Sequence, residues 1–196
     1  MLENAITLPF DPTYYAYKPA LVGASSAFQL EDDAIAWDRG GTVVRVPYRD
    51  IQRVRLAFRP MTMQPYRFMT EIWSVGGVKL AIGSCSLKSV IEQPRHDVEY
   101  NAFLTELHRR LVPFRNGIQF QTGSPFVLYW TGVAVFAALC ISAVGLIFRA
   151  LEIEAWLGAA FVAGMLGIFL WQTGGFLRRN KPGVYAPDQI PAHALP

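Results

Sequence analysis

The chain has 196 residues and a formal net charge of +3, and only 17% of its residues are charged, whereas a soluble domain usually carries about a quarter. This length fits one domain with an appendage, or two small domains. Charges are frequent before residue 123, but between residues 124 and 177 only Arg149, Glu152 and Glu154 are charged. The composition therefore excludes a uniformly soluble protein, and the small net charge gives no support to a nucleic-acid partner.

Residues 1–19 are predicted to form an N-terminal tail. The segment LPFDPTYYAYKPA is rich in proline and tyrosine, and its prolines prevent a helix of any length. The opening stretch MLENAITLPFDP lacks a basic region followed by an apolar one, so we expect no cleaved signal peptide.

Residues 20–115 are predicted to form a cytoplasmic domain of antiparallel strands followed by one helix. Gly-Gly pairs at 40–41 and 76–77 stand where hairpin turns need positive φ. The strand candidates around them are SAFQLE, AIAWD, TVVRV, IQRVRLAF, YRFMTEIWSV and VKLAIGSCS. A helix is expected over Asp97–Leu111, because its apolar residues follow the i, i+3, i+4, i+7 spacing. Asp97 is the expected N-cap, and Pro113 ends the helix.

The order of these elements, with VPYRDIQRVRL in the middle and EYNAFLTELHRRL at the end, resembles the bacterial pleckstrin-homology-like domains. Many of those domains are attached to transmembrane hairpins. Val46, Pro47, Asp50, Ile51 and Val54 carry the resemblance, which covers about residues 25–112. It implies an α+β fold, in which an antiparallel bent barrel is plugged by a C-terminal helix. It also implies a binding or scaffolding module without catalytic residues.

Arginines are concentrated in the middle of this domain. They are Arg45, Arg49, Arg53, Arg55, Arg59 and Arg67. In QRVRLAFR, Arg53, Arg55 and Arg59 alternate with apolar residues, so a strand would carry them on one face. This face is either a contact surface for anionic lipid headgroups or a partner, or a solvated strand face. In the second interpretation its arginines are partly paired with Asp32, Asp33 and Asp50.

A linker over residues 116–125 leads to two apolar segments, residues 126–148 and 155–177. Each would be about 33 Å long as a helix, enough to cross a hydrocarbon core of about 30 Å. Neither has the polar stripe of a soluble core helix. Charges at the bilayer centre cost about 2.5–3.5 kcal/mol, so the three charges noted above predict a short extracytoplasmic turn over residues 149–154. The predicted architecture is an α+β domain followed by a two-helix transmembrane hairpin.

Basic residues beside the two segments predict their orientation. Arg149 alone stands at the tip, whereas the termini side carries Arg109, Arg110, Arg115, Arg178, Arg179 and Lys181. We therefore expect a multi-pass protein of the bacterial inner (plasma) membrane with both termini in the cytoplasm.

The Pro-rich tail over residues 178–196 is either disordered or extended along the domain or a partner. In the extended form its anchors are Val184, Tyr185, Ile190 and Leu195.

Small residues recur at four-residue spacing in both segments and indicate close helix packing. The first segment carries Ala134, Ala138 and Ser142. The predicted helix-packing face of the second is formed by Ala159, Ala160, Ala163, Gly164 and Gly167. Either the two helices pack on each other through these residues, or one small face stays free for another membrane protein or a second copy. Neither segment contains an internal Asp, Glu, Lys, Arg or His, which argues against a transporter.

Residues suited to catalysis or metal binding are not grouped in this sequence. His96, His108 and His193 lie far apart, and a disulfide between Cys85 and Cys140 is not expected. We therefore expect a non-enzymatic protein without metal or cofactor.

Two hypotheses for the function remain. The protein is a membrane interaction module that binds protein or anionic lipid, or it is an accessory structural subunit of a membrane complex contacted mainly through the hairpin. Membrane lipids and a membrane protein or a second copy are the expected partners, and nucleic acid is not.

Overall fold

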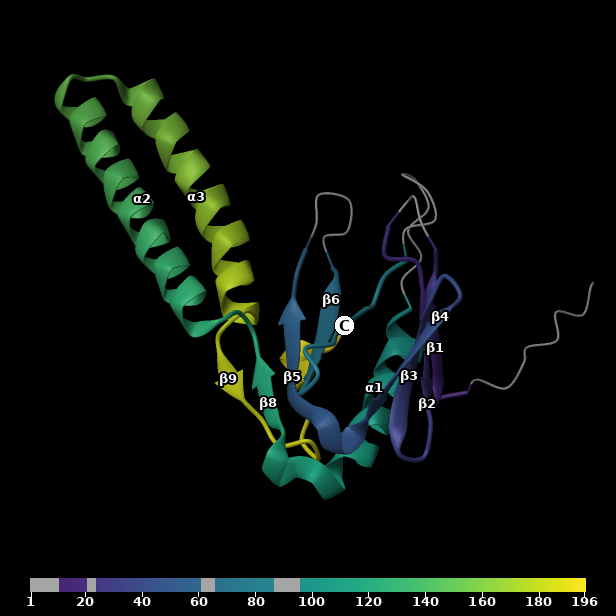
Figure 1. Cartoon of the computed structure of the whole chain (residues 1–196). Helices are drawn as coiled ribbons and strands as arrows, with labels where there is room; N and C mark the ends of the chain where they lie inside the picture. Colours follow the sequence, from purple (N-terminus) through teal and green to yellow (C-terminus); the bar gives the residue numbers. More distant parts are fainter. Residues whose placement is uncertain (1–10, 21–23, 61–65, 87–95) are drawn as a thin grey trace, which may run out of the picture. The chain divides into compact units, whose positions relative to one another are not determined.

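The computed structural model describes residues 11–20, 24–60, 66–86 and 96–196. The chain forms two compact units: Met1–Gln121 together with Val184–Pro196, and Thr122–Gly183. The first unit is a mixed α+β fold built from two antiparallel sheets, and the second is a pair of long helices (Figure 1). The expectation about a signal peptide rests mainly on residues 1–10, which lie outside the described residues.

The first sheet contains four strands in sequence order, β1 (Tyr14–Tyr17), β2 (Ser26–Leu30), β3 (Ala34–Arg39) and β4 (Thr42–Pro47). A short 3-10 turn, η1 (Tyr48–Asp50), leads into the second sheet. That sheet has the order β7-β6-β5-β8-β9. Its strands are β5 (Ile51–Phe58), β6 (Phe68–Ser74), β7 (Lys79–Gly83), β8 (Gln119–Thr122) and β9 (Gly183–Val184). The six predicted strands are confirmed, and positive φ is found at Gly40, Gly41 and Gly77 of the hairpin turns.

Strand β1 lies in the segment that was expected to be a tail. Its residues alternate in burial, because Tyr15 and Tyr17 face the core while Tyr14 is exposed. The hydroxyl of Tyr15 donates to the carbonyl of Gly83 at 2.6 Å, and that of Tyr17 donates to the carbonyl of Ala81 at 2.7 Å. These bonds link β1 to β7 of the other sheet through side chains. Within the described residues, no strand pairing closes the two sheets into a barrel.

Helix α1 (Asp97–Leu111) lies between the two sheets (Figure 1). Its fully buried residues are Tyr100, Phe103, Leu104, Leu107 and Leu111. The ring of Phe103 contacts Tyr15 of the first sheet, with 5.6 Å between ring centroids, and the Tyr100 hydroxyl is 2.7 Å from that of Thr70 in β6. The helix boundaries are confirmed, but the N-cap is His96 and not Asp97, because the backbone of Asp97 is already helical. A 3-10 turn, η2 (Val112–Gly117), follows and contains Pro113.

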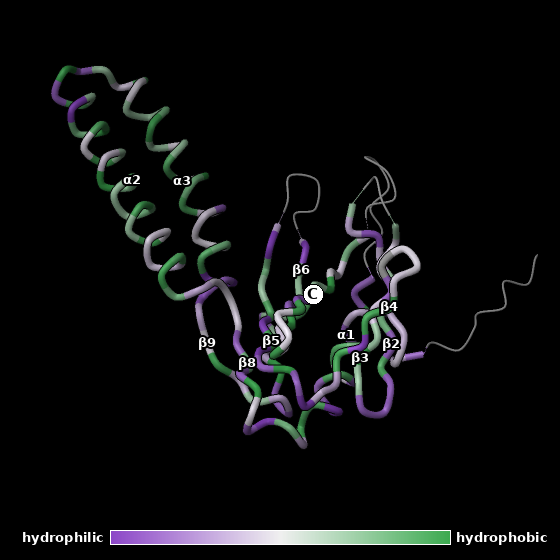
Figure 2. Tube along the Cα trace, in the orientation of Figure 1, coloured by the Kyte–Doolittle hydropathy of each residue, from purple (hydrophilic) through white to green (hydrophobic). Residues whose placement is uncertain are grey.

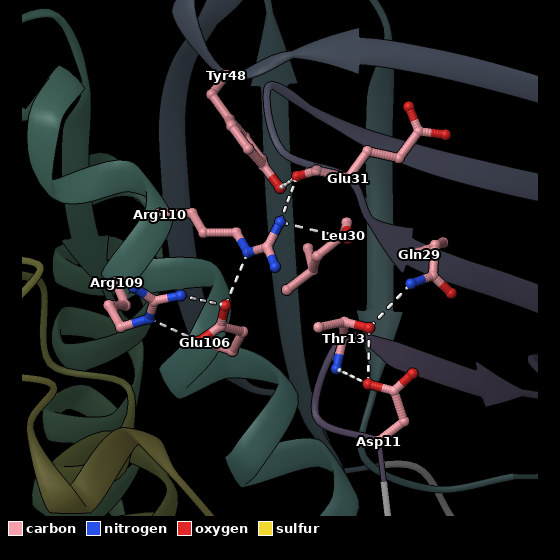
Figure 3. Close-up of polar contacts among 9 residues, drawn as sticks. All are labelled: Asp11, Thr13, Gln29, Leu30, Glu31, Tyr48, Glu106, Arg109 and Arg110. Atoms are coloured by element: carbon pink, nitrogen blue, oxygen red, sulfur yellow. Dashed lines mark hydrogen bonds and ion pairs between the residues drawn. The ribbon is translucent and has the colours of Figure 1, made fainter.

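The C-terminal end of α1 is tied to the first sheet by a network of polar contacts (Figure 3). The guanidinium of Arg110 donates to Glu106 at 2.7 Å and to the backbone carbonyls of Leu30 and Glu31. The hydroxyl of Tyr48 donates to the same Glu31 carbonyl at 2.9 Å. Arg109 adds two hydrogen bonds to Glu106, which lower the pKa of that carboxyl to about 2.

The C-terminal segment returns to the first unit after the second long helix. Tyr185, Ile190 and Leu195 pack against the hydrophobic core, and Ala194, in the 3-10 turn η3 (Ala192–Ala194), is buried. Of the two alternatives for the tail, extension along the domain is the one found at these anchors. It is wrong for Val184, whose side chain is 85% exposed because β9 turns it away from the core. Strand β8 was also not predicted, since it lies in the segment expected to be a linker, residues 116–125.

Helices α2 (Phe126–Glu152) and α3 (Trp156–Arg179) are both long and apolar enough to cross a membrane. Most residues along both helices are coloured as hydrophobic in Figure 2. Helix α2 continues past residue 148 as far as Glu152, which accepts a hydrogen bond from Arg149 at 3.0 Å. The turn is therefore only three residues long, and Glu154 within it has a φ of 59°.

The contact between α2 and α3 runs mainly through medium-sized and large side chains. The half-buried residues of α2 include Tyr129, Val133, Phe136, Cys140, Ala143 and Ile147, and those of α3 include Val162, Leu166, Phe169 and Thr173. The alternating spacing of three and four residues is typical of left-handed helix packing. The rings of Phe136 and Phe169 meet with 5.1 Å between centroids.

Most of the small residues therefore lie outside this contact. Among those named above, Ala159 alone is buried against the other helix, at 5% exposure. The remaining small residues are exposed, namely Ala134, Ala138, Ser142, Ala160, Ala163, Gly164 and Gly167. Of the two alternatives for the small residues, packing of the first helix on the second through Ala134, Ala138 and Ser142 is not what the structure has, because larger side chains occupy that position.

The two ends of the helix pair opposite the turn are held together. The backbone N–H of Ser124 donates to the carbonyl of Asn180 at 3.0 Å. Gly123 has a φ of 73°, and a Cβ atom there would lie 2.4 Å from the Asn180 carbonyl oxygen. Only glycine fits this close approach.

His108 connects α1 with the C-terminal segment. Its Nδ1 lies 2.7 Å from the Leu104 carbonyl, which can only accept, so Nδ1 carries the proton. Nε2 then accepts a hydrogen bond from the Tyr185 hydroxyl at 2.7 Å. Burial lowers the pKa of His108 to about 4, against the smaller opposing effect of the backbone hydrogen bond. The imidazole is therefore neutral in the folded protein at neutral pH.

We expect the free energy of unfolding to decrease as the pH falls from about 6.5 towards 4, because the unfolded chain protonates His108 and the folded chain resists it. A pKa lowered from 6.5 to about 4 corresponds to a loss of about 3 kcal/mol. The substitution His108→Gln should flatten this pH dependence, measured by denaturant unfolding of the full chain in detergent. His193→Gln, at an exposed position, is the control. An unchanged pH dependence in His108→Gln would contradict the expectation.

Candidate functional site: the basic face of the second sheet

Strand β5 separates apolar and basic side chains onto its two faces. Val54 and Leu56 are almost completely buried, while Arg53 and Arg55 lie on the opposite face, as the alternation in the sequence predicts. Arg59 follows immediately after the end of the strand and is exposed. Together with Lys79 of β7, these three arginines form the cluster that we call the basic face.

Trp73 of β6 lies at the centre of the basic face. It is the cross-strand partner of both Arg53 and Lys79. The guanidinium carbons of Arg53 and Arg55 lie 5.6 and 5.1 Å from the centre of the indole ring, and the Lys79 Nζ lies 5.0 Å from it. Contacts of this kind are worth about 0.5–1 kcal/mol each at exposed sites. One aromatic ring thus holds three cations near each other.

Glu71 supplies the negative charge of the basic face. Its side chain is buried, at 3% exposure, and its two oxygens accept from Arg59 at 3.0 Å and from Lys79 at 2.8 Å. Both cations are about half exposed, at 49% and 47%, so their outer surfaces still face solvent. Because one carboxylate faces four cations, the cluster keeps an excess of positive charge.

Among the described residues, the acids named in the solvated-face interpretation do not pair with the three arginines of the basic face. Asp50 lies 3.8 Å from Arg49, and Arg45 is paired with Glu31 at 2.9 Å. In the described part of the chain, no ion pair joins Asp32, Asp33 or Asp50 to the three arginines of the basic face. Solvation alone therefore does not describe this face, because its charges are organised around Trp73 and Glu71.

Arg55 is a half-buried cation in the middle of the cluster. It donates a hydrogen bond to the side-chain oxygen of Gln121 in β8 at 3.0 Å. Partial burial lowers the pKa of Arg55, Glu71 opposes this effect, and Arg53 and Arg59 add to it. The guanidinium nevertheless stays charged at any physiological pH, because the ordinary pKa of an arginine lies far above that range.

A pocket of about 550 Å³ adjoins the basic face at Arg53 and Trp73. Its remaining lining residues are Gln52, Ser74, Val75, Gly77, Gly117 and Gln119. A second pocket, of about 580 Å³, lies between η2, β8 and the returning C-terminal segment. The first pocket is the one that shares a cation with the cluster.

Several residues of this site were not predicted. Trp73, Lys79, Glu71 and the two glutamines of the pocket were absent from the expected face. A signal for two of them existed in the hairpin SVGGVK, whose turn pairs Trp73 with Lys79 across the strands. In the described residues no group of three or more His, Cys, Asp or Glu could hold a metal ion.

Comparisons with protein-family models, with curated proteins and with solved structures gave no match for this chain. The functional interpretation therefore depends on the geometry of the site and on the two long apolar helices.

Proposed function

We propose that this protein is a membrane-anchored, non-catalytic interaction module whose basic face contacts anionic lipid headgroups. The observation that carries the proposal is the gathering of Arg53, Arg55 and Lys79 around Trp73, next to the ion pair of Arg59 with Glu71. Basic residues near an anionic membrane surface contribute about 1 kcal/mol each. Three or four such charges on one face are enough for a salt-sensitive contact.

In this proposal the first unit is a pleckstrin-homology-like domain. Its support is the succession of a four-stranded sheet, a sheet that begins with β5, β6 and β7, and a helix whose apolar face fills the space between them. This succession agrees with the resemblance carried by residues 46–54. The side-chain links between β1 and β7 stand where strand pairing would close a barrel.

The proposal further assigns the protein to a bacterial inner membrane, with α2 and α3 as two spans and both termini in the cytoplasm. Strands β8 and β9 are neighbours in one sheet, and Tyr185 donates its backbone N–H to Phe120 at 3.2 Å. The chain thus leaves and re-enters the same unit on one side of the helix pair. The excess of Lys and Arg at that end favours the cytoplasm.

A second candidate function, an accessory structural subunit of a membrane complex, is favoured by one observation. Ala160, Ala163, Gly164 and Gly167 are exposed and take no part in the contact with α2. A Cβ at Gly164 or Gly167 would meet no atom within 4 Å. Small residues that do not pack within the hairpin are suited to close approach by another helix.

The lipid proposal predicts binding that depends on the basic face. We expect full-length protein in neutral phosphatidylcholine nanodiscs to co-sediment with vesicles containing 30% phosphatidylglycerol, and to lose binding as salt rises. Changing Arg53, Arg55 and Arg59 together to Gln should weaken binding at low salt about 100-fold, from about 1 kcal/mol per charge. Glu71→Gln should strengthen it, because it removes the one negative charge of the cluster.

The matched control changes Arg45, Arg49 and Arg109 to Gln, which removes the same charge outside the basic face. This control should bind almost as well as the unmodified protein. Equal losses in both triple variants, or equal binding to neutral vesicles, would refute a specific role for the basic face.

The topology is testable by cysteine labelling in a background with Cys85→Ser and Cys140→Ala. A cysteine at Glu152, close to the turn, should react with an impermeant maleimide added to intact cells. A cysteine at Lys181, which is exposed beyond α3, should react only after permeabilisation. The opposite labelling pattern would invert the proposed orientation.

The second candidate predicts a role for the exposed small residues. Gly164→Leu should insert normally, because leucine suits lipid, but should release any partner helix that approaches the glycine closely. Cross-linked species in native membranes would be compared for the unmodified protein, Gly164→Leu and the control Phe161→Leu, at another exposed position of α3. An unchanged cross-linking pattern in Gly164→Leu would contradict this second candidate and leave the helix pair with an anchoring role alone.

A further inference from the structure

The C-terminal segment, residues 184–196, is held to the first unit mainly by side chains. Three of its residues are prolines, which have no backbone N–H to donate. Beyond strand β9, the backbone N–H of Tyr185 donates to the Phe120 carbonyl at 3.2 Å, while the N–H groups of Gln189 and Ala194 bond to carbonyls within the segment. A segment with so few backbone hydrogen bonds to its support opens at a lower free-energy cost than the strands and the helix do.

His108 is the polar group of α1 that faces this segment. The residue is 1% exposed, and the ring centroids of Phe120 and Tyr185 lie 5.9 and 5.7 Å from that of its imidazole. Nδ1 donates to the Leu104 carbonyl, and Nε2 accepts from the Tyr185 hydroxyl. Both ring nitrogens of a neutral imidazole are satisfied in this way, so the docked segment fits the neutral ring.

The charged residues of α1 near His108 in the chain are engaged elsewhere. Glu106 pairs with Arg109 and Arg110, and Arg110 also donates to backbone carbonyls at the end of β2. Among the described residues, no carboxylate forms an ion pair with His108. Helix α1 itself keeps its support without the segment, because its apolar side is buried between the two sheets and Arg110 ties it to the first sheet.

The other elements around the imidazole offer no countercharge either. Strand β8 places Phe120 beside the ring, and its remaining residues are uncharged. The segment places the Tyr185 hydroxyl there, while its other ionisable side chains, Asp188 and His193, are exposed. The arginines of β5 lie on the outer face of the second sheet, around Trp73. A proton on the imidazole is therefore a buried charge without a partner, which is costly.

We propose that the contact between His108 and Tyr185 is an acid-sensitive switch, in which protonation of the imidazole releases the C-terminal segment while α1 and the two sheets stay folded. Release brings water to the imidazolium, and Nδ1 keeps its hydrogen bond to Leu104 within the helix. In the docked form, a protonated Nε2 would have to donate to the Tyr185 oxygen, and the hydroxyl proton would lose its acceptor. The released state exposes the part of the core that Tyr185, Ile190 and Leu195 otherwise cover.

Hydrogen exchange of the full-length protein in phosphatidylcholine nanodiscs tests the switch, because it reports local opening separately for the segment and for α1. The population of the released state should rise about 30-fold from pH 8 to pH 5, because the pKa of His108 is about 4 when the segment is docked and about 6.5 when water reaches the ring. After correction for the intrinsic pH dependence of exchange, the segment amides should lose protection by this factor. The α1 amides at Leu104 and Leu107 should stay at least about tenfold better protected at both pH values.

His108→Gln should remove the pH dependence of the segment, because a carboxamide accepts from Tyr185 without titrating, whereas His193→Gln, at an exposed position of the segment itself, should keep it. Tyr185→Phe, which removes the hydroxyl and keeps the ring, should lower the protection of the segment already at pH 8 and leave α1 unchanged. This variant decides the matter if His108→Gln fails to fold. Equal protection of the segment and α1 at both pH values would overturn the switch, because acid would then unfold the unit as a whole. Segment protection that is the same at pH 8 and pH 5 would overturn it as well.

Discussion

The return of the C-terminal segment to the first unit is the constraint on which the rest of the structure depends. Tyr185 is held there by its hydroxyl bond to His108, by its backbone bond to Phe120 and by ring contacts with both residues. The helix pair is therefore an insertion between two neighbouring strands of one sheet, and not an appendage at the end of a domain. Its two ends cannot separate without breaking this contact, and the bond between Ser124 and Asn180 closes the base of the helix pair.

The basic face depends on the same sheet. Arg55 reaches across to Gln121 of β8, so the strand that leads into α2 also positions the central cation. Glu71 is buried with two half-exposed cations, and an isolated buried carboxylate would be costly without them. The paired cations satisfy that buried charge, while Arg53 remains available at the edge of the pocket.

Local periodicity explains how much of this architecture could be predicted. The alternation in IQRVRLAF gave the faces of β5, and the helical spacing of Tyr100, Phe103, Leu104, Leu107 and Leu111 gave the buried side of α1. Strand β1 was not predicted, because the prolines around Tyr14–Tyr17 suggest a tail and its pairing with β2 is a tertiary contact. The role of Glu71 was not predicted, because an acid inside an apolar strand produces no periodic pattern. Its two partners, Arg59 and Lys79, come from other parts of the sequence. In α2 and α3 the four-residue spacing of the small residues indicated a packing face. The contact between the helices instead follows the 3-4 spacing of the larger side chains.

The order of the elements along the chain has a consequence for folding. The core of the first unit includes Ala194 and is completed by Tyr185, Ile190 and Leu195, all of which follow α3 in the sequence. Strands β2 to β7 and α1 can meet earlier, but His108 finds its hydroxyl partner only after both long helices have been made. An unpartnered buried imidazole nitrogen costs about 1–3 kcal/mol, so the unit is less stable until the tail arrives. Loss of the tail would therefore resemble a defect of the first unit and not a defect of the helix pair, although the tail lies beyond the last helix.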